Sequence, residues 1–172
     1  MKRKLITVGI ILVCFLLETT FFQALNFGSI TPNLLIAVTS SFGFMRGKNE
    51  GMFAGFICGL ISDVMFGGLL GLYALVYTVI GYLNGCFHKI FYPDDIKLPL
   101  SMIASSDFIY GNIIYIFQFL LRSRFDYFFY LRSIIIPELI YTILVSIFLY
   151  QLILFINQKL EVEEKRSASK FV

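Results

Sequence analysis

Residues 51–66 read GMFAGFICGLISDVMF, and this stretch decides the fold. Glycine recurs at every fourth position, as Gly51, Gly55 and Gly59, so that the three small residues follow one another along a helix surface. Asp63 is the single charged residue of the stretch. Small residues let two helix backbones approach closely, and such packing is a main source of helix association in lipid. The stretch therefore predicts a transmembrane helix that packs tightly against another helix, in this chain or in a partner.

The same spacing of glycine recurs around the next apolar stretch. A single pair of this kind is common in membrane helices, whereas three successive glycines are stronger evidence for close packing. We predict helix packing or partner contact for seven glycines: Gly51, Gly55, Gly59, Gly67, Gly71, Gly81 and Gly85.

The composition excludes a soluble protein. Of the 172 residues, 58% are hydrophobic and only 15% are charged, whereas soluble domains carry about 25% charged residues. A bilayer core about 30 Å thick needs about 20 apolar residues per helix. We therefore predict an all-α integral membrane protein, a bundle of six transmembrane helices: Leu5–Leu25, Ser29–Met45, Gly51–Phe66, Leu69–Phe87, Leu98–Leu121 and Leu131–Ile156. The second and third spans are short, so four or five spans are the alternatives. The spans form one domain over residues 1–157, followed by a charged cytoplasmic tail over 158–172.

Basic residues are distributed unequally between the two sides of this arrangement. With an inward N-terminus, eleven of the fourteen face the cytoplasm and three face outward, namely Arg122, Arg124 and Arg132. Cytoplasmic loops carry an excess of Lys and Arg, so we predict the inner membrane as the location and the cytoplasm for both termini. The first span follows a basic N-terminus, as a signal peptide would. No A-x-A-like cleavage site follows it, and we expect it to be permanent.

Four acidic residues lie within predicted spans: Glu18, Asp63, Asp107 and Glu138. An acid at the bilayer centre costs about 2.5–3.5 kcal/mol, and such residues usually face the bundle interior or a cavity. Asp107 lies nearer the middle, and the other three fall at a similar depth in the outer half. These three outer-half acids and Asn33 form the predicted intramembrane polar cluster: Glu18, Asn33, Asp63 and Glu138. The cluster either bonds its neighbours structurally, or lines an outward cavity or pairs with the outer-loop arginines. Asp63 precedes a glycine turn, where we expect it to accept hydrogen bonds from amides that begin the next helix.

The chain offers little for catalysis or metal binding. Its three cysteines fall within predicted spans and form no C-x-x-C pair, so we assign them no chemistry: Cys14, Cys58 and Cys86. His88 lies at a cytoplasmic helix end, which favours interaction with a helix C-terminus over metal binding. No phosphate-binding loop, H-E-x-x-H motif or nucleophile elbow occurs in the sequence. We expect no enzymatic activity, no cofactor, no metal and no nucleic-acid partner, and we expect membrane lipid among the partners.

Residues 31–86 resemble a known family. Thr31-Pro32-Asn33-Leu34-Leu35 opens one span, and Phe42-Gly43-Phe44-Met45-Arg46-Gly47 closes it. Gly55-Phe56-x-x-Gly59-Leu60-x-x-Asp63 follows, then Gly67-Gly68-Leu69-Leu70-Gly71-Leu72-Tyr73-Ala74-Leu75 and Gly81-Tyr82-Leu83-Asn84-Gly85. This pattern resembles the rod shape-determining protein MreD family of bacteria, and elsewhere the likeness is one of hydropathy, length and tail. Asn33 stands where the family frequently has aspartate, which argues against an essential ionised carboxylate at this position.

The resemblance implies a non-enzymatic subunit of the cell-wall elongation machinery, one that helps to set rod shape. It also implies partners: the bitopic protein MreC, actin-like MreB filaments, and the elongation polymerase with its penicillin-binding transpeptidase. The family resembles, in its six-helix architecture, the substrate-binding subunits of energy-coupling-factor transporters. A vitamin or small-molecule transporter subunit, with the polar cluster in an outward cavity, is therefore the alternative function. A third interpretation is a structural scaffold with no cavity.

Overall fold

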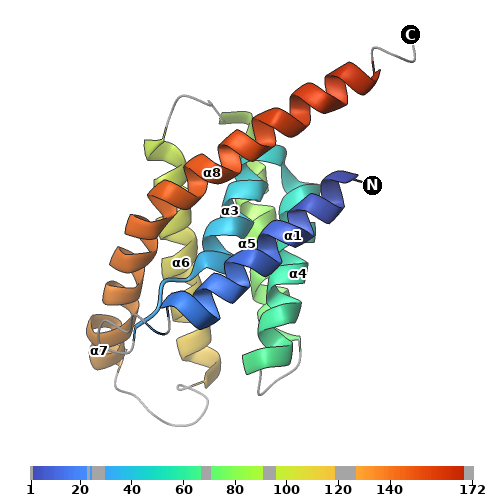
Figure 1. Cartoon of the computed structure of the whole chain (residues 1–172). Helices are drawn as coiled ribbons and strands as arrows, with labels where there is room; N and C mark the ends of the chain where they lie inside the picture. Colours follow the sequence, from blue (N-terminus) through green and yellow to red (C-terminus); the bar gives the residue numbers. More distant parts are fainter. Residues whose placement is uncertain are drawn as a thin grey trace.

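The chain is folded into helices (Figure 1). The computed structural model describes residues 2–22, 24, 30–66, 71–90, 96–118 and 127–168. The elements are, in chain order, α1 (Lys2–Leu16), η1 (Leu17–Phe22), α3 (Leu34–Arg46), α4 (Lys48–Phe66), α5 (Leu72–Cys86), η2 (Phe87–Ile90), α6 (Lys97–Gln118), α7 (Tyr127–Tyr130), η4 (Leu131–Ile135) and α8 (Ile136–Ala168). A π-helical turn, η1, continues α1, and η4 joins α7 to α8 without a break. The predicted all-α class is confirmed.

Three helical runs in the described residues are long and apolar enough to cross a membrane: Arg3–Phe22, Lys97–Phe117 and Tyr127–Val162. The helices between the first two runs are shorter or more polar. Thirteen residues form α3 and fifteen form α5, which gives lengths of about 20 Å and about 22 Å at about 1.5 Å per residue. The hydrocarbon core of a bilayer is about 30 Å thick. These short helices therefore end below at least one surface of any membrane that the long helices cross.

The helices begin at residues that differ from the starts of the predicted spans. α3 begins at Leu34 rather than Ser29, because Pro32 and Asn33 precede it and the Asn33 side chain caps it. α4 begins at Lys48, directly after the turn at Gly47. The last run of helix begins with α7 and continues to the end of α8, so that it takes in residues 158–168 of the predicted tail.

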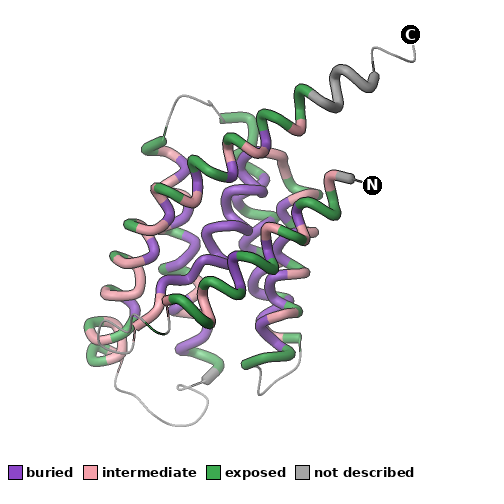
Figure 2. Tube along the Cα trace, viewed as in Figure 1, coloured by how far each residue is buried: buried purple, intermediate pink, exposed green. Residues whose placement is uncertain are grey.

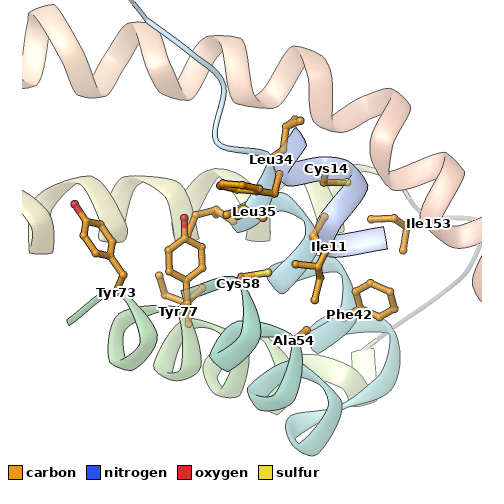
Figure 3. Close-up of a cluster of buried hydrophobic side chains, with 14 of the residues drawn as sticks. Ile11, Cys14, Leu34, Leu35, Phe42, Ala54, Cys58, Tyr73, Tyr77 and Ile153 are labelled. Carbon is orange, nitrogen blue, oxygen red and sulfur yellow. The ribbon is translucent and has the colours of Figure 1, made fainter. Parts of the chain in front are cut away.

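α3 forms the centre of the bundle. Every residue from Leu34 to Met45 is buried, and Figure 2 shows this helix as a buried segment among partly exposed ones. It contacts α1, α4, α5, α6 and α8. A helix that is apolar on all sides belongs in an interior, and before the terminal Arg46 the polar residues of α3 are confined to small hydroxyl side chains. Leu34, Leu35 and Phe42 join one core with side chains from α1, α4, α5 and α8 (Figure 3).

α4 and α5 form a hairpin whose backbones are in direct contact. A Cβ atom built on Gly55 would lie less than 3.0 Å from the carbonyl oxygen of Tyr77. One built on Gly59 would lie equally close to the backbone of Ala74. Backbone atoms cannot turn aside as the end of a flexible side chain can, so glycine is required at both positions. The glycine row of α4 is thus filled by α5 of the same chain.

The other four predicted glycines divide into three groups. Gly81 lies against the backbone of Gly51, and Gly85 lies against the backbone of Lys48, so both extend the close contact of the hairpin. Gly71 differs from the predicted packing role, because nothing lies within 4 Å of a Cβ built on it. Its φ of 98° instead places it in the left-handed region at the N-cap of α5, where glycine is favoured. Gly67 lies outside the described residues.

Replacing Gly59 with leucine should destabilise the protein by about 1–3 kcal/mol or more, the usual cost of overpacking, because the new side chain must displace the α5 backbone. We expect a lower unfolding temperature for the purified protein and less protein in the membrane. Phe56→Leu is the matched control, because Phe56 lies on the exposed side of the same helix. A Gly59→Leu variant as stable as the wild type would show that the two helices are not in this contact.

Candidate functional site

The first turn of α3 is buried, and its backbone N–H groups have found partners inside the protein. A helix leaves its first four N–H groups without intrahelical partners, and in an apolar surrounding each unpaired group costs several kcal/mol. Two of the four are satisfied at Asn33: its own N–H donates to Thr142 Oγ1 over 3.0 Å, and its Oδ1 accepts from Ile36 N over 3.1 Å. The same Oδ1 also accepts from the Tyr77 hydroxyl over 3.1 Å. Asn33 therefore connects the start of α3 to α5 and α8.

Glu18 satisfies the remaining two N–H groups. Its Oε2 accepts from Leu34 N over 3.0 Å and from Leu35 N over 3.2 Å. The residue belongs to η1, a π-helical turn, and π-turns occur frequently at functional positions. A carboxylate is favoured at this end of a helix because the helix dipole places partial positive charge there. Glu18 is thus a helix cap supplied from another helix.

Asp63 caps α5 in the same manner. Its Oδ1 accepts from Tyr73 N over 3.0 Å, and its Oδ2 accepts from Ala74 N over 2.9 Å. Asp63 itself is 4% exposed, and it comes from the far end of α4. These are amides of the first turn of the next helix, as expected for a carboxylate that precedes a glycine turn. The side chain locks the end of the hairpin at which α4 leads into α5, and glycine contacts hold the middle of the hairpin.

Asp107 lies on α6 and is also 4% exposed. The Thr142 hydroxyl, which accepts from the Asn33 backbone N–H, lies beside the Asp107 carboxylate. One carboxylate oxygen of Asp107, Oδ1, has no partner within the described part of the chain. Glu138 lies one turn before Thr142 on α8, close enough to interact electrostatically with Asp107 and Glu18. Acids from three helical elements, η1, α6 and α8, therefore lie near the start of α3.

The predicted polar cluster is divided into two parts. Glu18 and Asn33 meet at the start of α3, with Glu138 near them, whereas Asp63 is engaged separately at the start of α5. None of these acids is ion-paired with an arginine in the described residues, where the ion pair found joins Arg3 to Glu50 over 3.6 Å. Arg132 is exposed, and the other two outer-loop arginines lie outside the described residues.

The predicted polar cluster lacks three residues of this site: Tyr77, Thr142 and Asp107, the last of which was expected nearer the middle of the membrane. A weak signal for one of them was present. Glu138 and Thr142 are four residues apart, so an acid and a hydroxyl lie on one face of α8. Tyr77 carried no signal, because a tyrosine in an apolar helix is usually a core residue, and only its partner in space reveals its hydroxyl as a donor.

Groups that suggest other chemistry are engaged elsewhere. His88 Nδ1 lies 2.9 Å from the Phe44 carbonyl oxygen, in the last turn of α3, which agrees with the expected interaction with a helix C-terminus. No group of three or more His, Cys, Asp or Glu residues in the described chain is arranged to hold a metal ion. The polar side chains at the two helix starts are directed at backbone amides of the protein itself.

Replacing Asp63 tests the capping role. Asp63→Leu removes both acceptors and leaves two buried N–H groups unpaired, which should cost about 2 kcal/mol or more. Asp63→Asn keeps one acceptor oxygen, so its stability should lie between that of Asp63→Leu and that of the wild type. The unfolding temperature of purified protein and its level in the membrane measure the effect. If Asp63→Asn abolished function with stability and partner recovery intact, the charge itself would be required and the capping account would be wrong.

Comparison with known proteins assigns the family. The family model described as rod shape-determining protein MreD matches residues 2–160, which is nearly the whole chain. Searches of curated proteins and of solved structures find no match. The match includes both capped helix starts and the glycine hairpin between them. The chain therefore belongs to the rod shape-determining protein MreD family.

Proposed function

We propose that this protein is a non-enzymatic membrane subunit of the cell-wall elongation complex, and that it helps to set rod shape by binding and positioning MreC and the peptidoglycan synthases. The family match over residues 2–160 carries the proposal. The site supports it, because the half-buried carboxylate of Glu18 and the buried carboxylate of Asp63 stabilise helix starts rather than face an open cleft. A rigid bundle held in this way is suited to presenting a fixed surface to partners.

A transporter subunit would need its polar groups for a substrate. Both oxygens of Asp63 and the Oδ1 atom of Asn33 are already bonded to groups of this chain. A ligand would have to displace these bonds and leave buried amides unpaired, which costs about 1–3 kcal/mol for each group. This cost favours the scaffold over the transporter alternative.

We further propose six crossings of the inner membrane with both termini in the cytoplasm. The start of α1, the end of α8, the turn between α3 and α4, and η2 lie toward one end of the bundle, and α7 lies toward the other (Figure 1). Lys48, Lys89 and Lys159 lie toward the first end, as the excess of basic residues in cytoplasmic segments requires. The caps on α3 and α5 explain how two short helices belong to such a bundle, because their starts need no water.

Cysteine labelling in intact cells tests the topology. The variant should first have Cys14, Cys58 and Cys86 replaced, because Cys86 is exposed. A cysteine at Phe128, a residue that is 83% exposed, should react with a membrane-impermeant reagent, and one at Lys165 should react only after the cells are opened. The reverse pattern would overturn the proposed orientation.

The surface that binds MreC must lie elsewhere than on the glycine row, because α5 fills that row. Gly9 of α1 is exposed, and nothing lies within 4 Å of a Cβ built on it. Exposed apolar side chains flank it on the same helix, including Leu5, Leu12 and Val13. A small residue between larger ones lets a second transmembrane helix approach closely. We propose that the single transmembrane helix of MreC packs against α1 at Gly9.

Complementation with Gly9→Leu tests both the function and this surface. Depletion of the protein should give rounded, swollen cells, and the wild-type gene should restore the rods. Gly9→Leu should insert and fold normally but recover about tenfold less MreC, the change that about 1.4 kcal/mol of lost packing produces. Val79→Leu, on the exposed side of α5, is the matched control. Normal rods and normal MreC recovery with Gly9→Leu would exclude α1 as the contact, and rods that survive depletion would exclude the function.

A further inference from the structure

A basic pocket lies between the turn that joins α3 to α4 and the end of α5. Its volume is about 480 Å³, and it opens on the surface of the bundle. Eight residues line it: Arg46, Gly47, Lys48, Asn49, Gly85, Cys86, His88 and Lys89. Half of them carry basic side chains, and none of the lining residues in the described part of the chain is acidic. The pocket therefore suits an anion.

The chain keeps this pocket open and its walls in place. Gly47 has a φ of 92°, a left-handed conformation that other residues rarely adopt, and a Cβ built on it would face the His88 ring at 3.6 Å. Gly85 lets α5 approach Lys48, since a Cβ there would lie 2.5 Å from the Lys48 Cα. His88 is fixed by its contact with the Phe44 carbonyl, 2.9 Å away. The backbone thus determines the shape of the pocket.

Glu50, the acid nearest in sequence to Lys48, is engaged away from the pocket. It forms an ion pair with Arg3 at 3.6 Å. Arg46 turns toward α8, where its Nε donates to Asn157 Oδ1. Lys48 rests on the Tyr82 ring, with Nζ 5.2 Å from the ring centroid, and Lys89 is exposed. These two lysines are available to meet a negatively charged group, beside the positive end of the α4 dipole.

Apolar surface adjoins the pocket along α5 and η2. Four large side chains there are more than one-third exposed: Tyr82, Leu83, Phe87 and Ile90. A soluble phosphate would use the basic pocket alone, whereas a phospholipid would also lay its acyl chains along this face. Basic pockets at the cytoplasmic ends of transmembrane helices bind anionic headgroups.

We propose that this pocket binds the phosphate headgroup of an anionic phospholipid, with Lys48 and Lys89 as its cationic contacts and the exposed face of α5 and η2 against its acyl chains. The proposal rests on the proposed orientation, which places the pocket at the inner headgroup layer. The lipid occupies a fixed position beside the turn between α3 and α4, and it anchors that end of the bundle at the membrane surface.

Lipid retention by the purified full-length protein tests the site. Native mass spectrometry after exchange into equal amounts of phosphatidylglycerol and phosphatidylcholine should show retained phosphatidylglycerol on the wild type. The double variant Lys48→Gln/Lys89→Gln should retain about thirtyfold less, the change that a loss of about 1 kcal/mol for each of two lysines produces. Lys4→Gln/Lys159→Gln is the matched control. The control removes two lysines that rest on aromatic rings, as Lys48 does, namely those of Phe53 and Phe155. Neither lysine lines the pocket.

Three results would overturn the proposal: retention by the pocket variant, an equal loss in the control variant, or displacement of the lipid by inorganic phosphate at millimolar concentration. The last would identify a soluble phosphate as the ligand. Unfolding temperatures of both variants in the same detergent show whether a loss comes from misfolding, and single-lysine variants then replace an unstable double variant. The readout requires neither MreC nor a rod-shaped cell, so its failure is distinct from failure of the proposed function, and the labelling at position 165 tests the orientation separately.

Discussion

The two hydrogen bonds from the first turn of α3 to the Glu18 carboxylate are the contact on which the bundle depends. A helix that starts inside a membrane cannot pass its unpaired N–H groups to water, so the protein must supply an acceptor for each. α3 receives its acceptors from η1, from α8 and from its own cap residue, Asn33. The central helix is therefore tied to its neighbours by its backbone as well as by its side chains.

This constraint gives the buried acids a structural meaning. Placing an acid inside a membrane costs free energy, so such a residue usually suggests a functional role. Glu18 and Asp63 offset that free energy by accepting hydrogen bonds from the first amides of other helices. Each cap also fixes a tertiary contact, because Asp63 can reach the α5 amides only while the glycine row holds α4 against α5. Packing and capping thus reinforce each other, and loss of either should loosen both. Asp107 is the exception, since one of its oxygens has no partner among the described residues.

The sequence predicted the features that repeat within one helix. Apolar runs indicated the helices, and the spacing of Gly51, Gly55 and Gly59 indicated a close contact that the hairpin contains. Features that depend on a distant partner were not predictable in this way. Nothing in the sequence around Glu18 indicates that its carboxylate accepts hydrogen bonds from backbone amides sixteen and seventeen residues later. Gly43 continues the four-residue spacing toward the N-terminus, but the turn at Gly47 separates it from the row on α4. Its own close contact was not predicted, although a Cβ there would lie 2.7 Å from the Gly81 carbonyl oxygen. Gly71 matched the spacing but serves a turn, because spacing does not encode the backbone conformation.

The two ends of the bundle differ in how they use polar groups, and this difference bears on the role of a scaffold. At the capped end, polar side chains are turned inward and bonded to the chain, so that they hold the helices in one arrangement. At the other end, Lys48 and Lys89 are exposed around an open pocket. Between the ends, the surface of α1 offers an unfilled position at Gly9. A partner helix that packs there would contact a bundle whose shape is already fixed, so binding would not cost the conformational entropy of ordering the bundle. Such preorganisation lowers the cost of association, which is what a protein needs if it positions other proteins without performing chemistry of its own.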